Sequence, residues 1–330
     1  MTATVFIDGS AGTTGLQLMQ RLAGRTDLQI LELPDADRKD RDRRAAAIND
    51  ADIAVLCLPD DAARESVSLI RSDRVKVIDT STAHRVDPEW AYGFPEMEPD
   101  QAERIAGSGR VANPGCYPTG AVALLRPLVG RSILPPDFPV TVNAVSGYTG
   151  GGKAMVARFE DPDHSEPLTT PFRVYGLGLD HKHVPEIRVH GLLSGQPIFV
   201  PSVGRFRQGM IVQVPLQLRA LSTPTSPGAI AEVLVEHYRG YPAVSVFNHT
   251  VEGPGDGASV LDVETLVGTN DLHLHVFGST AENQVVLAAV LDNLGKGASG
   301  AAVQNLNLLL GVDPQTGLTE RLSDPGALAL

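Results

Sequence analysis

Cys116 lies in a setting that could make its side chain a nucleophile. It occurs in the segment Asn-Pro-Gly-Cys-Tyr-Pro-Thr-Gly, residues 113–120, directly before an apolar run that predicts a helix. At a helix N-terminus, unpaired backbone N–H groups and the positive end of the dipole favour the thiolate, the nucleophilic form. The other cysteine, Cys57, lies within the apolar run 53–58, where a thiol usually acts as a small hydrophobic side chain. Simple packing is the alternative interpretation for Cys116 as well.

Two histidines, His181 and His183, are candidates for moving a proton near neutral pH. In an extended segment, residues two positions apart point to the same side, so both rings could face one site. Glu186 could fix the tautomer of one ring. The alternatives are an exposed turn pair or a metal site. We predict no metal, because no cluster of Cys or Asp accompanies the pair. A second pair, His273 and His275, alternates with apolar residues and predicts the wetter face of a strand.

A glycine-rich turn follows the first predicted strand and opens the first predicted helix. In that context a Gly-x-x-Gly-x-x-Gly loop binds the pyrophosphate of a dinucleotide at the helix N-terminus. The alternative is a helix-start turn that binds nothing. The predicted cofactor loop consists of Gly9, Ser10, Ala11, Gly12, Thr13, Thr14 and Gly15.

The choice between NAD and NADP depends on residues after the second predicted strand. An acidic side chain there favours NAD, whereas nearby Arg or Lys accommodates the 2′-phosphate of NADP. Glu32 is close to the strand end, and Arg38 and Lys39 follow. The basic pair could bind the phosphate or could be a solvated helix start. We predict NADP, with Pro59 as a further cofactor contact.

The elements that position these residues fall into two patterns. Apolar strand-like runs alternate with helix-length segments over the first third, which predicts a parallel sheet covered on both faces. The predicted strands are 4–7, 28–33, 53–58, 75–79 and 109–113, with helices near 16–22 and 61–71. After about residue 130, longer alternating strands are predicted at 140–145, 211–218, 259–267 and 272–277, with helices at 229–238, 281–294 and 298–310.

The predicted fold class is therefore α/β, with a Rossmann-like parallel-sheet domain and an α+β catalytic and dimerisation domain whose sheet is mixed and largely antiparallel. We expect the NADP-binding domain to comprise residues 1–115 plus about 296–330, since the last helix pattern suits packing on the first sheet. The catalytic and oligomerisation domain is expected at 116–295.

Composition excludes several classes of partner. A chain of 330 residues has room for two domains, and 42% hydrophobic with 20% charged residues is typical of a globular protein in water. The net charge of −12 argues against a nucleic acid or an anionic membrane as partner, but it does not exclude a small anionic substrate. Two cysteines in unlike contexts and no signal-peptide pattern predict a cytoplasmic protein.

Taken together, these motifs resemble the N-acetyl-gamma-glutamyl-phosphate reductase family, the arginine-pathway relatives of aspartate-semialdehyde dehydrogenase. The likeness runs over nearly the whole chain and most resembles the family's shorter branch. Besides the segments above, it includes Asp-Thr-Ser-Thr-Ala-His-Arg at 79–85, Tyr-Gly-Phe-Pro-Glu-Met at 92–97, Ser-Gly-Tyr-Thr-Gly-Gly-Gly-Lys at 146–153, His-Lys-His-Val-Pro-Glu at 181–186 and Gly-Ala-Ser-Gly-Ala-Ala-Val-Gln-Asn at 297–305.

The resemblance implies that Cys116 is the nucleophile and NADP(H) the cofactor. The thiolate would attack an acyl phosphate and expel inorganic phosphate, and hydride would reduce the thioester to the aldehyde. His181 is slightly favoured as the acid/base, with His183 orienting substrate. Expected substrate contacts are Arg85, Ser146, Tyr148, Tyr175 and Glu186, and Asn305 is expected to contact the nicotinamide amide. Residues 80 and 82–84 differ from longer relatives, so pocket contacts there are not transferred.

Relatives form homo-oligomers, so a homodimer or homotetramer is expected. One alternative keeps the mechanism with another acyl phosphate, such as an aspartyl or aminoadipyl one. Another is a dinucleotide-binding redox sensor with Cys116 as the sensing thiol, which would need neither the histidine pair nor Arg85. A thiol hydrolase would leave the glycine loop without a purpose.

Overall fold

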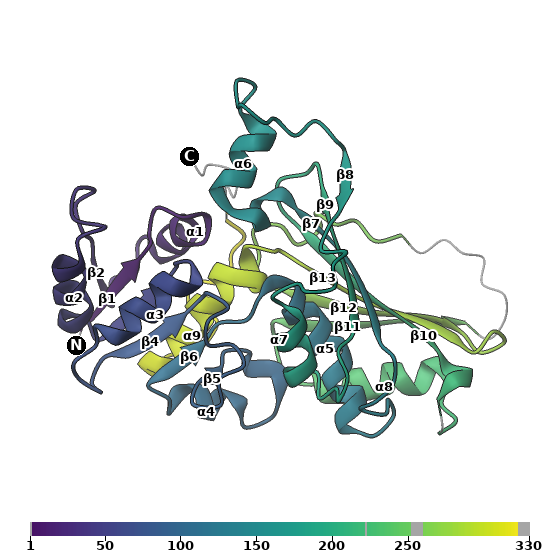
Figure 1. The fold of residues 1–330 in the computed structure, drawn as a ribbon. Helices are drawn as coiled ribbons and strands as arrows, with labels where there is room; N and C mark the ends of the chain where they lie inside the picture. Colours follow the sequence, from purple (N-terminus) through teal and green to yellow (C-terminus); the bar gives the residue numbers. More distant parts are fainter. Residues whose placement is uncertain (1, 222, 252–259, 323–330) are drawn as a thin grey trace. The chain divides into compact units, whose positions relative to one another are not determined.

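The computed structural model describes residues 2–221, 223–251 and 260–322 (Figure 1). The chain divides into two compact units. Unit 1 comprises Met1–Gly115 and Gly297–Leu330, and unit 2 comprises Cys116–Lys296. Among the described residues, no helix has the length and apolar character needed to cross a membrane.

Unit 1 contains a six-stranded sheet with the order β2-β1-β3-β4-β6-β5, and all its neighbouring strands pair in parallel. The expected Rossmann-like parallel sheet is confirmed. Its strands are β1 (Ala3–Asp8), β2 (Leu28–Leu31), β3 (Ile53–Leu56), β4 (Lys76–Asp79), β5 (Ala91–Tyr92) and β6 (Arg110–Ala112). Its helices are α1 (Thr13–Leu22), α2 (Arg41–Asp50), α3 (Asp60–Ser68), α4 (Gln101–Ala106) and α9 (Gly300–Leu310).

Both faces of this sheet are buried, because successive strand residues point to opposite sides and both sides are apolar. Val5, Ile7 and Val55 pack in a core with side chains from α1, α4 and α9. Phe6 and Leu56, their sequence neighbours, pack in a separate core with side chains from α2 and α3. The last helix of the chain thus completes the layer over the first sheet.

Unit 2 contains a seven-stranded mixed sheet with the order β11-β12-β13-β10-β7-β9-β8. Four of its strand pairs are antiparallel, and β11·β12 and β7·β9 are parallel, so the mixed, largely antiparallel prediction is confirmed. Its strands are β7 (Thr141–Gly147), β8 (Phe172–Val174), β9 (Ile198–Gly204), β10 (Met210–Gln217), β11 (Val244–Val251), β12 (Leu272–Ser279) and β13 (Gln284–Leu291). Its helices are α5 (Cys116–Gly130), α6 (Gly152–Glu160), α7 (Val184–His190) and α8 (Pro227–His237).

Two predictions about this sheet are wrong. The segment 281–294, predicted as a helix, forms β13, which pairs on both sides with β10 and β12. Of the predicted strand 259–267, residue 259 lies outside the described residues and the remainder forms turns that pack Leu261, Val263 and Leu266 against the sheet. Strands β8, β9 and β11 were not predicted.

Candidate active site

Cys116 is the first residue of α5, as the sequence predicts, and its side chain is partly exposed. Pro118 fits the first turn because a helix leaves the first N–H groups without an intrahelical partner. Most of the other α5 side chains are buried, and Gly120 lies so close to the sheet that an added Cβ would come within 2.9 Å of Val212 Cγ2. The helix that carries the thiol is therefore held firmly against the sheet.

The residue after the cysteine, Tyr117, belongs to a cluster of rings that includes both candidate histidines. Its ring centroid lies 6.2 Å from that of His181 and 5.8 Å from that of His183, and the two imidazoles are 4.8 Å apart. Tyr175 lies 5.8 Å from His181, and Phe199 closes the cluster at 5.1 Å from the same ring. The structure thus brings Tyr117, the neighbour of Cys116, both histidines and Tyr175 into one place.

The two tyrosine hydroxyls form a short chain. The Tyr175 hydroxyl donates to the Tyr117 hydroxyl at 3.1 Å, which donates to the Ser202 carbonyl at 3.0 Å. Burial is the largest cause that raises the pKa of both phenols, that of Tyr175 to about 12, and the charge of the Cys116 thiolate adds to the effect. Both phenols therefore stay neutral at physiological pH and serve as hydrogen-bonding groups beside the thiol. The Ser146 hydroxyl also interacts with Tyr117.

His181 has a defined tautomer. His181 precedes a turn that leads into α7, in which His183 has the helical dihedrals φ −84° and ψ −11°. The expectation of an extended segment at 181–183 is therefore wrong. In this turn the backbone N–H of His183 donates to Nδ1 of His181 at 3.1 Å. Since Nδ1 accepts, the proton of the neutral ring resides on Nε2. Burial lowers the pKa of His181, with Lys182 adding to the effect and Asp180 and Glu186 opposing it. The ring is thus a neutral donor near pH 7.

Three other predicted substrate contacts lie in different local settings. Glu186 is 1% exposed in the first turn of α7, near the histidines. Tyr148 is not in the ring cluster described above: its hydroxyl donates to Glu160 Oε1 at 2.9 Å, and its ring stacks on Phe159. Arg85, in unit 1, donates from Nε to the Asn113 carbonyl at 2.9 Å. A contact of these side chains with substrate remains a prediction.

The glycine loop has the geometry of an anion site. Helix α1 begins without a side-chain cap on its first-turn N–H groups and without an acidic residue in that turn. Gly9 has φ +85°, and an added Cβ there would come 2.3 Å from the Cys57 carbonyl oxygen. A Cβ on Gly15 would come 2.4 Å from the Gly9 carbonyl oxygen, whereas one on Gly12 would meet nothing closer than 3.4 Å. Gly9 and Gly15 are thus required by the fold, and Gly12 leaves an open cradle that a Cβ would fill.

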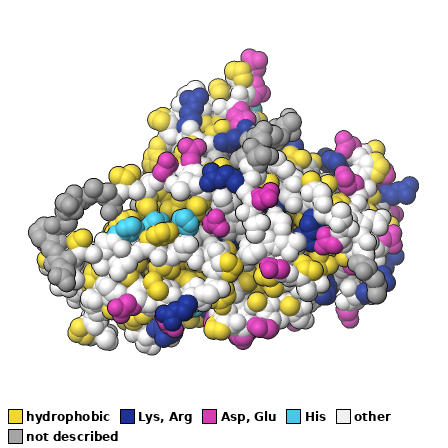
Figure 2. All heavy atoms as spheres, turned by 180° about the vertical axis from the view of Figure 1, so that it is seen from behind, with side chains coloured by type: hydrophobic (Ala, Val, Ile, Leu, Met, Phe, Trp, Pro, Cys, Tyr) yellow, Lys and Arg dark blue, Asp and Glu magenta, His cyan; other side chains and the backbone are white. Residues whose placement is uncertain are grey.

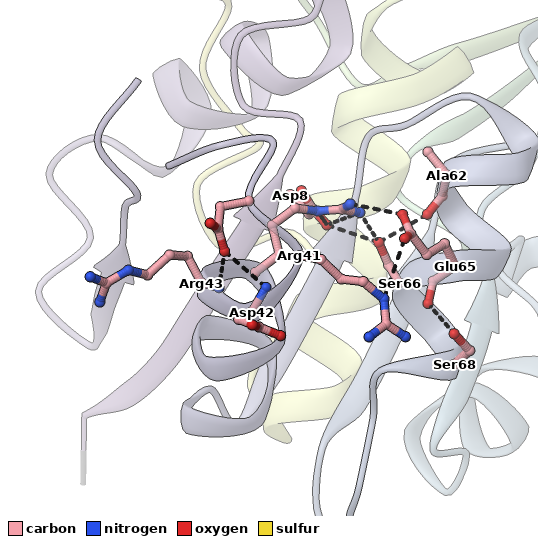
Figure 3. A network of polar contacts seen from close by, with 10 residues as sticks. Asp8, Arg41, Asp42, Arg43, Ala62, Glu65, Ser66 and Ser68 are labelled. Atoms are coloured by element: carbon pink, nitrogen blue, oxygen red, sulfur yellow. Dashed lines mark hydrogen bonds and ion pairs between the residues drawn. The ribbon is translucent and has the colours of Figure 1, made fainter. Parts of the chain in front are cut away.

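A buried charged network anchors the strand end that precedes this loop (Figure 3). Asp8 accepts from Nε and Nη2 of Arg44 at 3.2 and 3.0 Å and from the Ser66 hydroxyl at 2.9 Å. Arg44 also donates to Glu65 at 3.0 Å, and these contacts raise the pKa of its guanidinium against the opposing effect of burial. The network joins β1, α2 and α3 and thereby fixes the residue directly before Gly9.

The remaining predicted cofactor residues differ in their exposure and in the contacts they already make within the protein. Arg38 pairs with Asp35 at 2.9 Å, and Pro59 precedes the first residue of α3. Lys39 is exposed. Asn305 is fully buried and donates from Nδ2 to the Gly93 carbonyl at 3.0 Å and to Asn113 Oδ1 at 2.9 Å. Its Oδ1 has no hydrogen-bond partner among the described residues, so one acceptor remains for a ligand amide.

Comparisons with known proteins agree with this geometry. Residues 34–105 match the family described as "Semialdehyde dehydrogenase, NAD binding domain", and residues 116–293 match "Semialdehyde dehydrogenase, dimerisation domain". The N-acetyl-gamma-glutamyl-phosphate reductase of Brucella anthropi is 55% identical over 312 residues, which cover 94% of this chain and 99% of that one. The reductase of Rhizobium johnstonii is 54% identical over 311 residues, with coverages of 94% and 99%.

The chain belongs to the N-acetyl-gamma-glutamyl-phosphate reductase family.

Solved structures of aspartate-semialdehyde dehydrogenases share the fold of this reductase-family chain. The Vibrio cholerae enzyme II superposes with a TM-score of 0.66 at 16% identity, covering 94% of this chain and 99% of that one. The Candida albicans enzyme, solved with NADP, gives a TM-score of 0.60 at 12% identity, with coverages of 94% and 99%. At these identities the likeness concerns the fold alone.

Tyr117 is the residue of this reductase-family site that the sequence analysis missed. A signal was available, because a large aromatic residue directly follows the cysteine at the predicted helix start. Its contacts with His181 and His183 depend on chain segments that are more than sixty positions apart in sequence. No local pattern predicts such a contact.

Proposed function

We propose that this protein reduces N-acetyl-L-glutamyl 5-phosphate to N-acetyl-L-glutamate 5-semialdehyde and releases inorganic phosphate, a step of arginine biosynthesis. It is an NADP-dependent oxidoreductase acting on an acyl phosphate. Relatives that carry the reductase name are 54–55% identical over 94% of the chain. The observation that carries the mechanism is the cluster at the start of α5, where the residue next to Cys116 contacts both His181 and His183.

Cys116 is the proposed nucleophile. Its thiolate attacks the acyl carbon, the C–O bond to phosphate breaks, and inorganic phosphate leaves with the bonding electrons. The acyl group is then held as a thioester on Sγ. A thioester accepts hydride more readily than a carboxylate does, and the covalent bond keeps the reacting carbon in place. The start of helix α5 supports this step because it favours the charged thiolate.

NADPH, when bound, supplies the hydride that reduces the acyl carbon. The protein groups proposed to hold it are the loop Gly9–Gly15 for the pyrophosphate and Asn305 Oδ1 for the nicotinamide amide. The uncapped α1 terminus and the open position beside Gly12 fit a pyrophosphate. Arg38 and Lys39 are the proposed cations for the 2′-phosphate, with Arg38 exchanging part of its bond to Asp35 for the phosphate.

His181 is the proposed proton donor. Its Nε2–H can donate to the acyl oxygen as negative charge develops there, and the same nitrogen can receive a proton back when the thiohemiacetal collapses to aldehyde and thiolate. The bond from the His183 N–H to Nδ1 fixes the ring in this tautomer. His183, Ser146, Tyr175 and Glu186 are proposed to orient the substrate.

The match to a dimerisation domain supports assembly of identical chains, and we propose a homodimer or a homotetramer. A cytoplasmic location is proposed as well, in keeping with two free cysteines. The alternatives, another acyl phosphate as substrate or a redox sensor, are less favoured because the relatives carry the reductase name along almost their full length.

The test runs the reaction in reverse. The protein is mixed with N-acetylglutamate semialdehyde, inorganic phosphate and NADP, and the absorbance of reduced nicotinamide is followed. We expect reduction that requires phosphate and disappears in Cys116→Ala. Cys57→Ala is the matched control and should retain activity, because burial raises the pKa of the Cys57 thiol to about 12 and leaves it unreactive.

Reduction without phosphate would indicate a non-phosphorylating enzyme. Bound cofactor without any turnover would favour the sensor. Faster turnover with an aspartyl or aminoadipyl semialdehyde would change the substrate and keep the mechanism.

A further inference from the structure

Ser299 links two helices of unit 1 through its hydroxyl group. The residue is fully buried and directly precedes α9. Its hydroxyl donates to Gln17 Oε1 at 2.6 Å and accepts from Nε of Arg21 at 3.1 Å. Gln17 and Arg21 are four positions apart on α1, so both side chains leave the same face of that helix. One hydroxyl is therefore donor and acceptor between α1 and the start of α9.

This polar link lies in a contact that is otherwise apolar. Leu18 and Leu22 of α1 pack in one core with Val303 and Leu306 of α9. Hydrophobic packing holds the helices together but has no direction, whereas a hydrogen bond fixes a distance and an angle. The Ser299 link therefore sets where α9 lies along α1, which packing alone fixes less closely.

A second link joins the same turn to the segment that leads to Cys116. Asn113 donates from Nδ2 to the Ala298 carbonyl at 3.1 Å, and its Oδ1 accepts from Asn305 Nδ2 at 2.9 Å. Both asparagines are fully buried. The start of α9 is thus held to α1 by Ser299 and to the end of β6 by Asn113.

The two linked helices carry the two ends of the proposed cofactor site. Helix α1 begins in the loop Gly9–Gly15, which is proposed to hold the pyrophosphate. Asn305 lies on α9, six positions after Ser299, and its Oδ1 is proposed to accept from the nicotinamide amide. The distance between these two contacts depends on how α9 lies on α1.

We propose that Ser299 is a positioning residue that sets the distance between the pyrophosphate contact on α1 and the nicotinamide contact on α9. This role rests on the proposed cofactor site. A ligand that is held at both ends binds tightly only where the spacing of the two sites matches its length. Ser299 acts through Gln17 and Arg21 on one helix and through Asn305 on the other, and needs no contact with the cofactor itself.

The experiment compares two probes by calorimetric titration of the full-length protein. One is NADPH, and the other is 2′-phospho-ADP-ribose, which has the pyrophosphate and lacks the nicotinamide. Ser299→Ala removes the link between the helices. We expect this variant to bind NADPH about tenfold more weakly or worse and to bind the fragment within about twofold of wild type, because the fragment uses only one end of the site.

Two substitutions of Gln17 separate the hydrogen bond from packing. Gln17→Met removes the acceptor Oε1 at similar volume and should repeat the loss of NADPH affinity. Gln17→Glu keeps an acceptor for Ser299, and Arg21, bonded to the same hydroxyl, supplies the opposite charge. It loses no hydrogen bond to a described residue, because Gln17 Nε2 has no partner among them. We expect Gln17→Glu to keep NADPH affinity within about threefold of wild type.

Asn307→Ala is the matched control for general loosening of the two helices. Asn307 is fully buried on α9 and accepts from Nη1 of Arg25 at 3.0 Å, beyond the opposite end of α1 from the glycine loop. This variant should lower the melting temperature and leave the ratio of the NADPH and fragment affinities unchanged.

Unchanged NADPH affinity in a folded Ser299→Ala protein would overturn the proposal, and so would an equal loss for both probes. Circular dichroism shows whether each variant folds, and the comparison of Gln17→Met with Gln17→Glu gives the answer if Ser299→Ala does not fold. Equal NADPH affinities in these two variants would then overturn the proposal. Failure of the proposed function shows instead as wild-type protein without phosphate-dependent reduction of NADP, so the two failures are distinguishable.

Discussion

Cys116 and Cys57 carry the same thiol in opposite surroundings. Cys57 follows β3, and burial raises its pKa to about 12, with the charges of Asp79 and Asp8 adding to the effect. Cys116 opens α5 directly before Tyr117, whose ring contacts His181 and His183; both cysteines are partly exposed. The chemistry proposed for Cys116 and the packing role of Cys57 thus both follow from the element that carries each cysteine.

Two glycines of the loop are expected to matter for different reasons: the fold requires Gly15, whereas the proposed cofactor requires Gly12. Gly12→Ala should leave the melting temperature nearly unchanged, because its Cβ meets no protein atom closer than 3.4 Å, and should weaken NADPH binding about tenfold or more by filling the cradle. Gly15→Ala should destabilise the protein by about 1–3 kcal/mol, since its Cβ would come 2.4 Å from the Gly9 carbonyl oxygen. Calorimetry and cofactor titration of both variants test this. Equal cofactor affinity in Gly12→Ala and wild type would contradict the site.

The tautomer of His181 gives a second test at residue level. The amide nitrogen of Gln can reach the position of Nε2, whereas that of Asn lies near Nδ1. His181→Asn should lower kcat about 100- to 10,000-fold, the usual cost of losing an acid/base group. His181→Gln should retain about tenfold more activity through a hydrogen bond to the acyl oxygen. Similar losses in both variants, or a larger loss in His183→Asn, would move the proton donor to another group.

At the scale of secondary-structure elements, the sequence predicts the helices and strands whose residues follow a local pattern. The strands of unit 1 are mostly apolar and the glycine turn marks the first helix, so the parallel sheet and the loop were both predictable. The segment 281–294 was not predictable as a strand. Residues 285–291 are all apolar and lack the alternation that distinguishes a strand from a buried helix.

The ring cluster of the candidate site was only partly predictable for the same reason. The positions of Cys116 and of the histidine pair could be predicted from local motifs. The turn at 181–183 and the contacts of Tyr117 could not, because they depend on α7 and β9 packing beside the start of α5. The hydroxyl of Tyr148 donates to Glu160, and its contact with substrate stays a prediction.

Three histidines on β11 and β12, His249, His273 and His275, form a histidine row that predicts a pH dependence of stability. Figure 2 shows a row of histidine side chains among hydrophobic ones on one face of the molecule. Burial is the largest cause that lowers the pKa of His275 to about 4, and His249 and His273 add to it. Burial also lowers the pKa of His273, with Asp271 opposing the shift. The unfolded chain therefore binds a proton more readily than the folded chain, and stability present above about pH 6.5 is lost as pH falls towards 4. Solvent screening reduces the effect to about 1 kcal/mol.

Thermal unfolding at pH 7.5 and pH 4.5 measures this effect. His275→Gln should reduce the loss of melting temperature on acidification, while the contribution of carboxylates stays the same in both proteins. An identical loss in wild type and His275→Gln would show that the row does not titrate in this range.

At the scale of the whole molecule, the two parts of the proposed reaction belong to different units. The loop Gly9–Gly15 and Asn305 belong to unit 1, and Cys116, His181 and His183 belong to unit 2. In the proposed mechanism, acyl transfer to the Cys116 thiol needs no dinucleotide. Hydride transfer needs both units. The first half of the reaction should therefore proceed alone when the cofactor is withheld.

The most direct measurement is mass spectrometry of the protein after mixing with N-acetylglutamyl phosphate in the absence of NADPH. We expect one N-acetylglutamyl group per chain on the peptide that contains Cys116, removed by hydroxylamine as a thioester is, with an equal amount of phosphate released. Gly12→Ala should form the same adduct, and Cys116→Ala should form none. An adduct on another residue, or phosphate release that persists unchanged in Cys116→Ala, would contradict the thioester mechanism.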